Sequence, residues 1–215
     1  MLFVSCQPYK DEEYFTKDFI LNIVLAAKLG GARGLRIEGV ENLLFVKKKI
    51  DLPIVGLIKK RIEEKERYIC PDIESIEKIL EIGCDFIAVD YTLRDDCNRG
   101  YYIEISNHIH KNSDCKIIAD ISTVEEAKLA IECNVDYVST TLNGYTKYTK
   151  NAALPNLNLI KQLSKEGIKN IIAEGGYSNH SQYIKALKCG AKIVVIGTAI
   201  TRIHLIVKKI IQGHY

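Results

Sequence analysis

The chain has 215 residues, of which 47% are hydrophobic, and its formal net charge at pH 7 is +3. This length can bury one substantial core, and the even composition predicts a single domain over residues 1–215. The small excess of positive charge is spread along the chain, so nucleic-acid binding is not indicated. The N-terminus turns polar too soon for a signal sequence and no apolar run is long enough to cross a bilayer, so we expect no membrane association.

Seven cysteines lie far apart, are odd in number and form no Cys-x-x-Cys pair. This pattern is typical of reduced thiols, most of them buried, and favours a cytoplasmic protein. Five histidines, of which only His108 and His110 are close together, lack companions at metal-ligand spacing. We therefore expect no protein-bound metal and no other cofactor.

Eight short apolar runs alternate with segments of helical period along the chain. Apolar runs without a polar face are typical of strands in a parallel sheet that helices cover on the outside. The pattern predicts a single α/β (β/α)8 TIM barrel, with a doubly wound open sheet as the alternative. The predicted strands cover residues 2–6, 33–37, 54–58, 86–89, 116–119, 136–139, 170–173 and 193–196.

The joints from helix to strand share a local pattern in which a helix ends at Gly or Asn. It occurs in residues 82–86, 133–137 and 189–193, and it predicts a left-handed residue at the end of each helix. Ser122-Thr-Val-Glu125 resembles a capping box that begins a helix. In the last helical segment, Ile203, Ile206, Val207 and Ile210 fall on one face.

The loops after the seventh and eighth predicted strands are rich in glycine. They read Glu174-Gly-Gly-Tyr177 and Gly197-Thr-Ala-Ile-Thr-Arg202. Loops at these positions of a barrel often bind phosphate, because glycine lets backbone N–H groups approach an anion and the next helix points its positive end there. We expect Arg202, in the first turn of that helix, to add a charged clamp. The alternative is two tight turns.

Lys59 ends the third strand and Glu174 the seventh, so in an eight-stranded barrel they face each other across the mouth. Two such groups could invert a stereocentre beside a carbonyl, one removing a proton and the other returning it from the opposite face. Lys59 can act as a base only if its pKa is depressed, which burial and the neighbouring Lys60 and Arg61 favour.

Other polar residues follow the remaining strands and suggest a polyhydroxylated, anionic ligand. Asp90 and Asp120 end strands four and five, while Arg36 is placed after strand two and Gln7 after strand one. Each alone could be a helix cap, an ion pair or a surface residue. Two tyrosines after strand six, Tyr145 and Tyr148, could line the pocket or pack its wall.

Seven motifs occur in the order in which they appear in the bacterial N-acetylmannosamine-6-phosphate 2-epimerases, and the chain resembles that family nearly end to end. The motifs are Val4-Ser-Cys-Gln7, Gly34-Leu-Arg36, Gly56-Leu-Ile-Lys59, Ala119-Asp-Ile-Ser-Thr123, Ser139-Thr-Thr-Leu-Asn-Gly-Tyr-Thr146, Ala173-Glu-Gly175 and Gly197-Thr-Ala-Ile-Thr-Arg202.

The resemblance implies a TIM-barrel isomerase of sialic acid breakdown. Such an enzyme would convert N-acetylmannosamine 6-phosphate to N-acetylglucosamine 6-phosphate without a metal or organic cofactor. It implies Lys59 and Glu174 as the catalytic pair. Substrate contacts would come from Gln7, Arg36, Asp90, Asp120 and Thr141, and the phosphate cradle from Gly175, Gly197, Thr198 and Arg202.

The chain also departs from the family pattern in three loops. Lys59-Lys-Arg-Ile62 stands where Lys-Arg-Asp-Tyr is usual, and a charged run, residues 63–67, follows. Asp90-Tyr-Thr92 replaces Asp-Ala-Thr and predicts a bulky ring near the mouth, while Gly176-Tyr-Ser178 replaces a more polar turn.

The sequence leaves two other functions open: a different phosphosugar epimerase or isomerase, and a non-catalytic barrel that only binds phosphosugars. The first should show metal ligands or paired aspartates, and the second should lack a lysine at position 59 or a glutamate at position 174. A homodimer through exposed helix faces is plausible.

Overall fold

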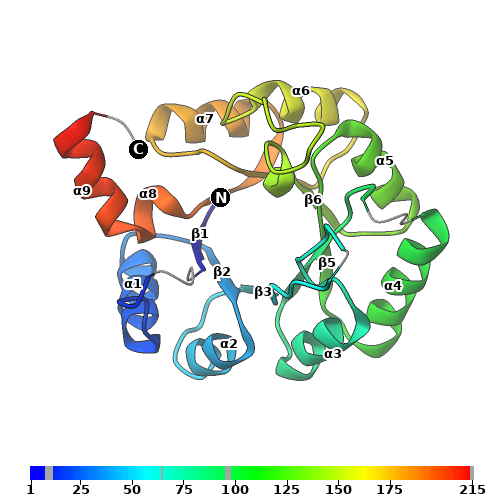
Figure 1. The fold of residues 1–215 in the computed structure, drawn as a ribbon, viewed down its shortest axis with the longest axis horizontal. Coiled ribbons are helices and arrows are strands. Elements are labelled where there is room, and N and C mark those ends of the chain that lie inside the picture. The colour runs from blue at the N-terminus through cyan, green and yellow to red at the C-terminus, as the bar shows by residue number, and fades with distance from the viewer. Residues whose placement is uncertain (8–11, 64, 95–97, 214–215) are drawn as a thin grey trace.

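Eight parallel strands close into a barrel, and helices surround it (Figure 1). The computed structural model describes residues 1–7, 12–63, 65–94 and 98–213. The first strand pairs with the second and also with the eighth, through Leu2 opposite Val194. This closure confirms the predicted (β/α)8 TIM barrel and excludes the open sheet.

Every predicted strand overlaps an observed one, and the largest difference is the earlier start of the eighth. The strands are β1 (Leu2–Cys6), β2 (Gly34–Glu38), β3 (Ile54–Leu57), β4 (Phe86–Asp90), β5 (Lys116–Asp120), β6 (Tyr137–Ser139), β7 (Ile171–Glu174) and β8 (Ala191–Ile196).

The helices that follow the strands form the outer layer, and side-chain caps begin α1, α3, α4, α5, α6 and α7. Their bounds are α1 (Lys17–Leu29), α2 (Val40–Lys47), α3 (Ile73–Ile82), α4 (Arg99–Asn112), α5 (Val124–Glu132), α6 (Leu157–Lys165), α7 (His180–Lys188), α8 (Thr198–Thr201) and α9 (Ile203–Gln212), with a 3₁₀ turn η1 (Thr140–Leu142) after β6.

The chain after β8 differs from the prediction. A single-turn helix, α8, comes first, and Arg202 lies between α8 and α9 rather than in a first helical turn. One turn sums few peptide dipoles, so α8 supplies less positive potential than the expected longer helix. The apolar face of α9 is also not covered by the barrel, because Figure 1 shows this helix projecting from the ring, and none of its residues is buried.

The helix-to-strand joints confirm the predicted left-handed residues. Gly83, Asn134 and Gly190 have φ angles of 73°, 61° and 115°. Glycine accepts this conformation without a steric penalty, and asparagine is one of the few other residues that tolerates it. These residues turn the chain directly from each helix into the next strand.

Aromatic side chains fill the barrel at the N-terminal ends of the strands. Phe86 packs edge-on against Phe3 and against Tyr137, with ring centroids 6.2 and 5.6 Å apart. A Cβ on Gly34 would lie 2.4 Å from the Phe3 ring, so glycine makes room for that ring. The packed end leaves the C-terminal ends of the strands for a cavity.

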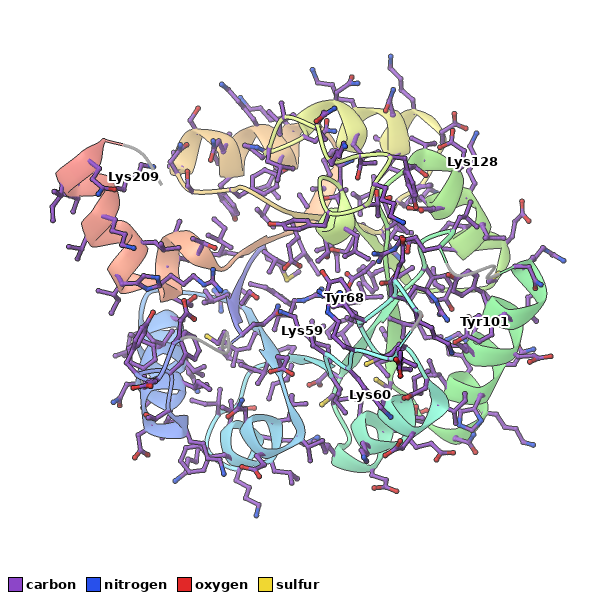
Figure 2. The ribbon with its side chains drawn as sticks, in the orientation of Figure 1. Lys59, Lys60, Tyr68, Tyr101, Lys128 and Lys209 are labelled. Atoms are coloured by element: carbon purple, nitrogen blue, oxygen red, sulfur yellow. The ribbon has the colours of Figure 1, made fainter. Side chains whose placement is uncertain are left out.

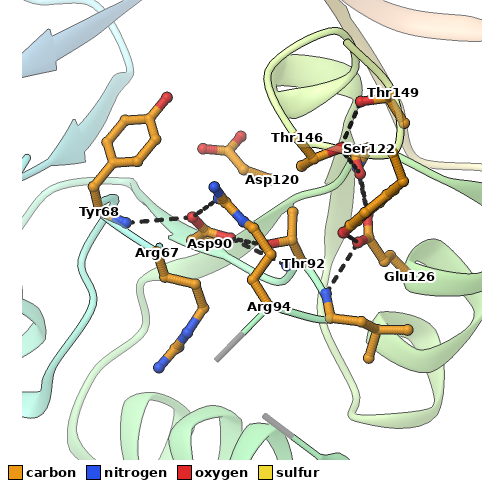
Figure 3. Close-up of polar contacts among 12 residues, drawn as sticks. Arg67, Tyr68, Asp90, Thr92, Arg94, Asp120, Ser122, Glu126, Thr146 and Thr149 are labelled. Atoms are coloured by element: carbon orange, nitrogen blue, oxygen red, sulfur yellow. Dashed lines mark hydrogen bonds and ion pairs between the residues drawn. The ribbon is translucent and has the colours of Figure 1, made fainter. Parts of the chain in front are cut away.

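A capping box does begin α5, but one residue later than the sequence suggested. Thr123 is the N-cap, and its partner is Glu126. Glu126 is only 1% exposed, and its carboxylate also accepts hydrogen bonds from the Ser122 hydroxyl (2.7 Å), the Leu93 backbone N–H (3.0 Å) and the Tyr148 hydroxyl. This buried carboxylate therefore joins the loops after β4, β5 and β6 (Figure 3).

The substitution Glu126→Ala should destabilise the protein by about 3 kcal/mol, because it leaves several buried donors without their acceptor. Urea denaturation would measure the loss as a lower midpoint. The matched control is Glu125→Ala, which changes an exposed carboxylate on the same turn. Equal midpoints for the two variants would contradict this role of Glu126.

Six cysteines lie among the described residues, and all are free thiols. Five are buried and Cys189 is partly exposed, as the sequence predicted, whereas Cys97 lies outside the described residues. Within the described ranges, every helix is too short or too polar to cross a bilayer.

Candidate active site

A cavity of about 420 Å³ opens where the C-terminal ends of the strands converge. Side chains and loops from β1, β2, β3, β6, β7 and β8 line it, and Figure 2 shows Lys59 near the centre of the ring of helices. The structure thus brings together most of the predicted site residues: Gln7, Arg36, Lys59, Thr141, Glu174, Gly175, Gly197, Thr198 and Arg202.

Arg36, which lines the cavity, belongs to a buried ion pair. Arg36 is 1% exposed, and both terminal nitrogens of its guanidinium contact Asp120, at 3.1 and 2.6 Å. Asp120 is completely buried and does not line the cavity. Although burial disfavours the guanidinium charge, the carboxylates of Asp120 and Glu174 outweigh it and raise the pKa of Arg36, so this residue stays charged.

Arg36 also holds Glu174 in place. Its Nη1 lies 3.2 Å from Glu174 Oε2. The hydroxyl of Thr141 lies 2.6 Å from Asp120 Oδ1 and 3.2 Å from Glu174 Oε2, so it can donate to only one of them at a time. The position of the Glu174 carboxylate is therefore fixed by Arg36 of β2 and Thr141 of the turn after β6, both of which also contact Asp120 of β5.

The environment shifts the pKa values of Lys59 and Glu174 in opposite directions. Burial raises the pKa of Glu174, and Asp120 adds to this, against the attraction of Arg36 and Lys59. Burial together with the positive charges of Arg36 and Arg202 lowers the pKa of Lys59. Both shifts favour the neutral form of the group and bring the two pKa values closer together, as suits an acid–base pair.

Glycine-rich turns and a cation form the end of the cavity beside β7 and β8. Gly175 and Gly176 have φ angles of 110° and 76°, and a Cβ on Gly176 would lie 2.7 Å from Leu154 Cβ. A Cβ on Gly197 would lie 3.3 Å from that of Ser5. With the guanidinium of Arg202 also in the lining, this end suits an anionic group.

Asp90 does not line the cavity. It is completely buried, and its carboxylate accepts hydrogen bonds from Arg94 Nη2 (2.6 Å), the Thr92 hydroxyl (2.6 Å) and the backbone N–H of Tyr68 (3.4 Å), as Figure 3 shows. Burial raises the pKa of Asp90 to about 6, although Arg94 opposes the shift. Asp90 therefore supports the loop that carries Tyr68.

Tyr68 lines the cavity, and the sequence analysis did not select it. It lies on the loop after β3, which pairs back on itself through an antiparallel bridge from Lys59 to Ile69. The Arg61 guanidinium lies 4.9 Å from the centre of the Tyr68 ring. The one available signal was the triplet Tyr68-Ile-Cys70, which is apolar and directly follows a charged run.

Two residues of the loops that depart from the family pattern, Arg67 and Tyr91, are buried. Arg67, at the end of the charged run, is buried, and its guanidinium lies 4.7 Å from the centre of the Tyr101 ring. Glu64 lies outside the described residues.

The prediction that the Tyr91 ring lies near the mouth is wrong, because side chains alternate along a strand and this one turns outward. It stacks on Tyr102 of α4, with 4.3 Å between ring centroids.

The two tyrosines after β6 have different places. Tyr145 lines the cavity at its rim and is 60% exposed, whereas Tyr148 donates its hydroxyl hydrogen bond to Glu126 and does not line the cavity. Tyr177 is buried beside the turn after β7. The rim is thus partly aromatic.

Comparisons with known proteins agree on one family. The family model described as "Putative N-acetylmannosamine-6-phosphate epimerase" matches residues 20–214. Two relatives named "Putative N-acetylmannosamine-6-phosphate 2-epimerase" are each 37% identical to this chain. The relative from Caldanaerobacter subterraneus aligns over 98% of this chain and 89% of its own length, and that from Clostridioides difficile over 99% and 95%.

A solved structure gives the same result. The N-acetylmannosamine-6-phosphate 2-epimerase from Clostridium perfringens superposes with a TM-score of 0.92 and 34% sequence identity, covering 99% of this chain and 92% of that one. Sequence and fold therefore agree over nearly the whole length, and the chain belongs to the N-acetylmannosamine-6-phosphate epimerase family.

Proposed function

We propose that this protein interconverts N-acetylmannosamine 6-phosphate and N-acetylglucosamine 6-phosphate by moving a proton at C2. One observation carries the proposal: Lys59 and Glu174 line the same cavity from β3 and β7, with pKa values shifted toward each other. Family membership supplies the substrate. The relatives' names give N-acetylmannosamine 6-phosphate as the sugar and C2 as the epimerised carbon.

The proposed reaction starts from the opened sugar, in which C2 lies next to the C1 carbonyl. One member of the pair takes the C2 proton, and the electrons of the C–H bond form a C1–C2 double bond while the carbonyl oxygen becomes an oxyanion. The other member then gives a proton to the opposite face of C2 and restores the carbonyl. The pair exchanges roles for the reverse reaction.

The charges of the site suit this exchange. With a protonated lysine and an ionised glutamate, the positive charges of Arg36 and Lys59 balance the negative charges of Asp120 and Glu174. With both members of the pair neutral, Arg36 still balances Asp120. The buried site therefore keeps the same net charge in both protonation states, which avoids the cost of burying an uncompensated ion.

Arg36 is the proposed donor to the developing oxyanion. Its Nε atom is buried and makes no hydrogen bond to any of the residues that the structure describes, whereas its terminal nitrogens hold Asp120 and Glu174. A donor already fixed by a buried carboxylate needs no reorganisation as negative charge develops. On this account Asp120 and Asp90 act on the substrate indirectly, through Arg36 and through the loop of Tyr68.

Substrate binding is assigned to the two ends of the cavity. We assign the phosphate to Gly175, Gly197, Thr198 and Arg202, and the sugar hydroxyls to Gln7 and Thr141, all of which belong to the lining. Proton transfer at C2 by this pair needs no metal or organic cofactor.

The proposed roles of Lys59 and Glu174 can be tested by using proton NMR to monitor exchange of the C2 proton in heavy water. Lys59→Ala and Glu174→Gln should each lower epimerisation at least a hundredfold, the scale of one lost acid–base group. Each variant should still exchange the C2 proton of one epimer, and the two variants should favour different epimers, because the remaining group reaches only one face.

The matched control is Lys60→Ala, which removes the adjacent lysine, an exposed residue paired with Asp72 and Glu74. It should retain wild-type turnover. Near-wild-type epimerisation by Lys59→Ala or Glu174→Gln would contradict the assignment.

The pH dependence of kcat provides a second test. Epimerisation needs one proton shared between the pair, so the rate should fall when Glu174 and Lys59 are both protonated and when both are deprotonated. Because the pKa of Glu174 is raised from 4.5 and that of Lys59 is lowered from 10.5, the acidic limb should lie above pH 4.5 and the alkaline limb below pH 10.5. Limbs at or outside these values would contradict the shifts.

We also propose that the protein is a cytoplasmic homodimer joined through α9. The six described thiols are free, which fits a reducing compartment. Ile203, Val207, Ile210 and Ile211 on α9 are 48%, 47%, 79% and 75% exposed, and such a face on a helix that projects from the barrel is suited to burial against a second copy.

The substitution Ile210→Asp should shift the protein from dimer to monomer in sedimentation velocity, because it places a charge in the apolar interface. Lys208→Asp is the control, since it puts the same charge at an exposed polar position of α9. A wild-type protein that sediments as a monomer would contradict the dimer.

A further inference from the structure

Four side chains form a cluster where the chain enters α1 and leaves α8. Glu12 Oε1 lies 3.3 Å from Arg202 Nε and 3.6 Å from His204 Nε2. His204 Nδ1 in turn lies 2.5 Å from the Tyr14 hydroxyl, and the two rings meet edge to face. The cluster therefore ties the turn before α1 to the residue that we assigned to the phosphate.

The Glu12 carboxylate is held in place by its own turn. Glu12 is 8% exposed, and its backbone carbonyl accepts a hydrogen bond from the N–H of Phe15 (2.8 Å), whose ring packs in the core. Burial and the nearby Glu12 carboxylate also raise the pKa of Tyr14. A buried carboxylate in contact with the Arg202 guanidinium and the His204 ring is a fixed group rather than a freely moving surface charge.

Arg202, by contrast, has a long side chain whose direction depends on the partners that it contacts. Its φ and ψ angles, −101° and 75°, belong to neither α8 nor α9, and its long side chain has many rotamers. The structure shows the side chain mostly buried, lining the cavity and contacting Glu12 through Nε. Contact at Nε sets the plane of the guanidinium, whose five N–H donors allow it to bind a second anion.

We propose that Glu12 is the positioning residue for Arg202 in substrate binding: it orients the guanidinium toward the phosphate group and so sets the affinity for phosphorylated ligands. The inference rests on the proposed function, in which Arg202 binds the phosphate. His204 completes the cluster by contacting the same Glu12 oxygen as Arg202, and Tyr14 holds the His204 ring from its other nitrogen.

A different role for Glu12 predicts the opposite change in phosphate affinity when its side chain is removed. A carboxylate near a bound phosphate repels it, so a Glu12 that merely occupied Arg202 in the absence of substrate would weaken phosphate binding. Removal of the side chain would then tighten binding. If Glu12 positions Arg202, removal weakens binding, and an amide that still accepts a hydrogen bond retains it.

The test is a double-mutant cycle on the full-length protein, with Glu12→Ala, Arg202→Ala and the double variant. Titration of inorganic phosphate followed by ³¹P NMR gives Kd, and turnover of N-acetylmannosamine 6-phosphate gives KM and kcat. Glu12→Ala should raise Kd and KM roughly tenfold, the scale of one charged hydrogen bond, and change kcat much less. In the Arg202→Ala background it should have no further effect.

Two more variants separate positioning from a general structural effect. Glu12→Gln should restore most of the phosphate affinity, because its amide oxygen can accept the same hydrogen bond. Glu41→Ala, which removes an exposed partner of Lys17 elsewhere on the surface, should leave Kd unchanged.

Three results would overturn the inference. Tighter phosphate binding by Glu12→Ala would make Glu12 a competitor, and full additivity in the double variant would make it independent of Arg202. Wild-type phosphate binding by Arg202→Ala would instead overturn the assignment of the phosphate site itself, so failure of that proposal is distinguishable from failure of the role of Glu12.

Discussion

The buried ion pair between Arg36 and Asp120 is the interaction on which the site depends. A guanidinium that is 1% exposed would be very costly without a partner, and Asp120 supplies two contacts to it from the strand three places along the barrel. The charged Arg36 in turn fixes Glu174. One pair thus joins β2, β5 and β7 and determines where the proposed acid–base group stands.

The barrel explains how residues so far apart in sequence meet. Parallel strands all point their C-terminal ends at one mouth, and the aromatic side chains of Phe3, Phe86 and Tyr137 fill the opposite end. Polar groups at the strand ends can therefore meet without breaking the core. Loops add further groups to the site. Asp90 supports the loop that carries Tyr68, and Glu12, in the turn before α1, contacts Arg202 at the end of the cavity beside β8.

Much of this arrangement could be predicted from the sequence, because buried strands and strand-end residues have strong local patterns. Eight apolar runs predicted the barrel that the structure has. The positions of Lys59 and Glu174 at strand ends predicted that both would reach the cavity. The orientation of single side chains could not be predicted. Tyr91 was expected at the mouth but stacks on Tyr102 of α4, and Asp90 does not line the cavity, because whether a side chain faces the ligand or the packing layer depends on register.

Contacts between loops were also beyond the reach of the sequence. The pairing of Glu12 with Arg202 joins residues nearly a whole chain apart, and no spacing rule connects them. The short α8 followed by α9 likewise carries no clear break signal, so Arg202 was predicted in a first helical turn. The capping box was misplaced by one residue, since both Ser122 and Thr123 are good caps and only the tertiary contacts of Glu126 choose between them.

Proton NMR of the wild-type protein with N-acetylmannosamine 6-phosphate in heavy water would show whether the protein epimerises C2 by removing and returning a proton. We expect N-acetylglucosamine 6-phosphate to accumulate with deuterium at C2. Product that retains the original C2 proton, or bound substrate that shows neither exchange nor conversion, would rule out this mechanism.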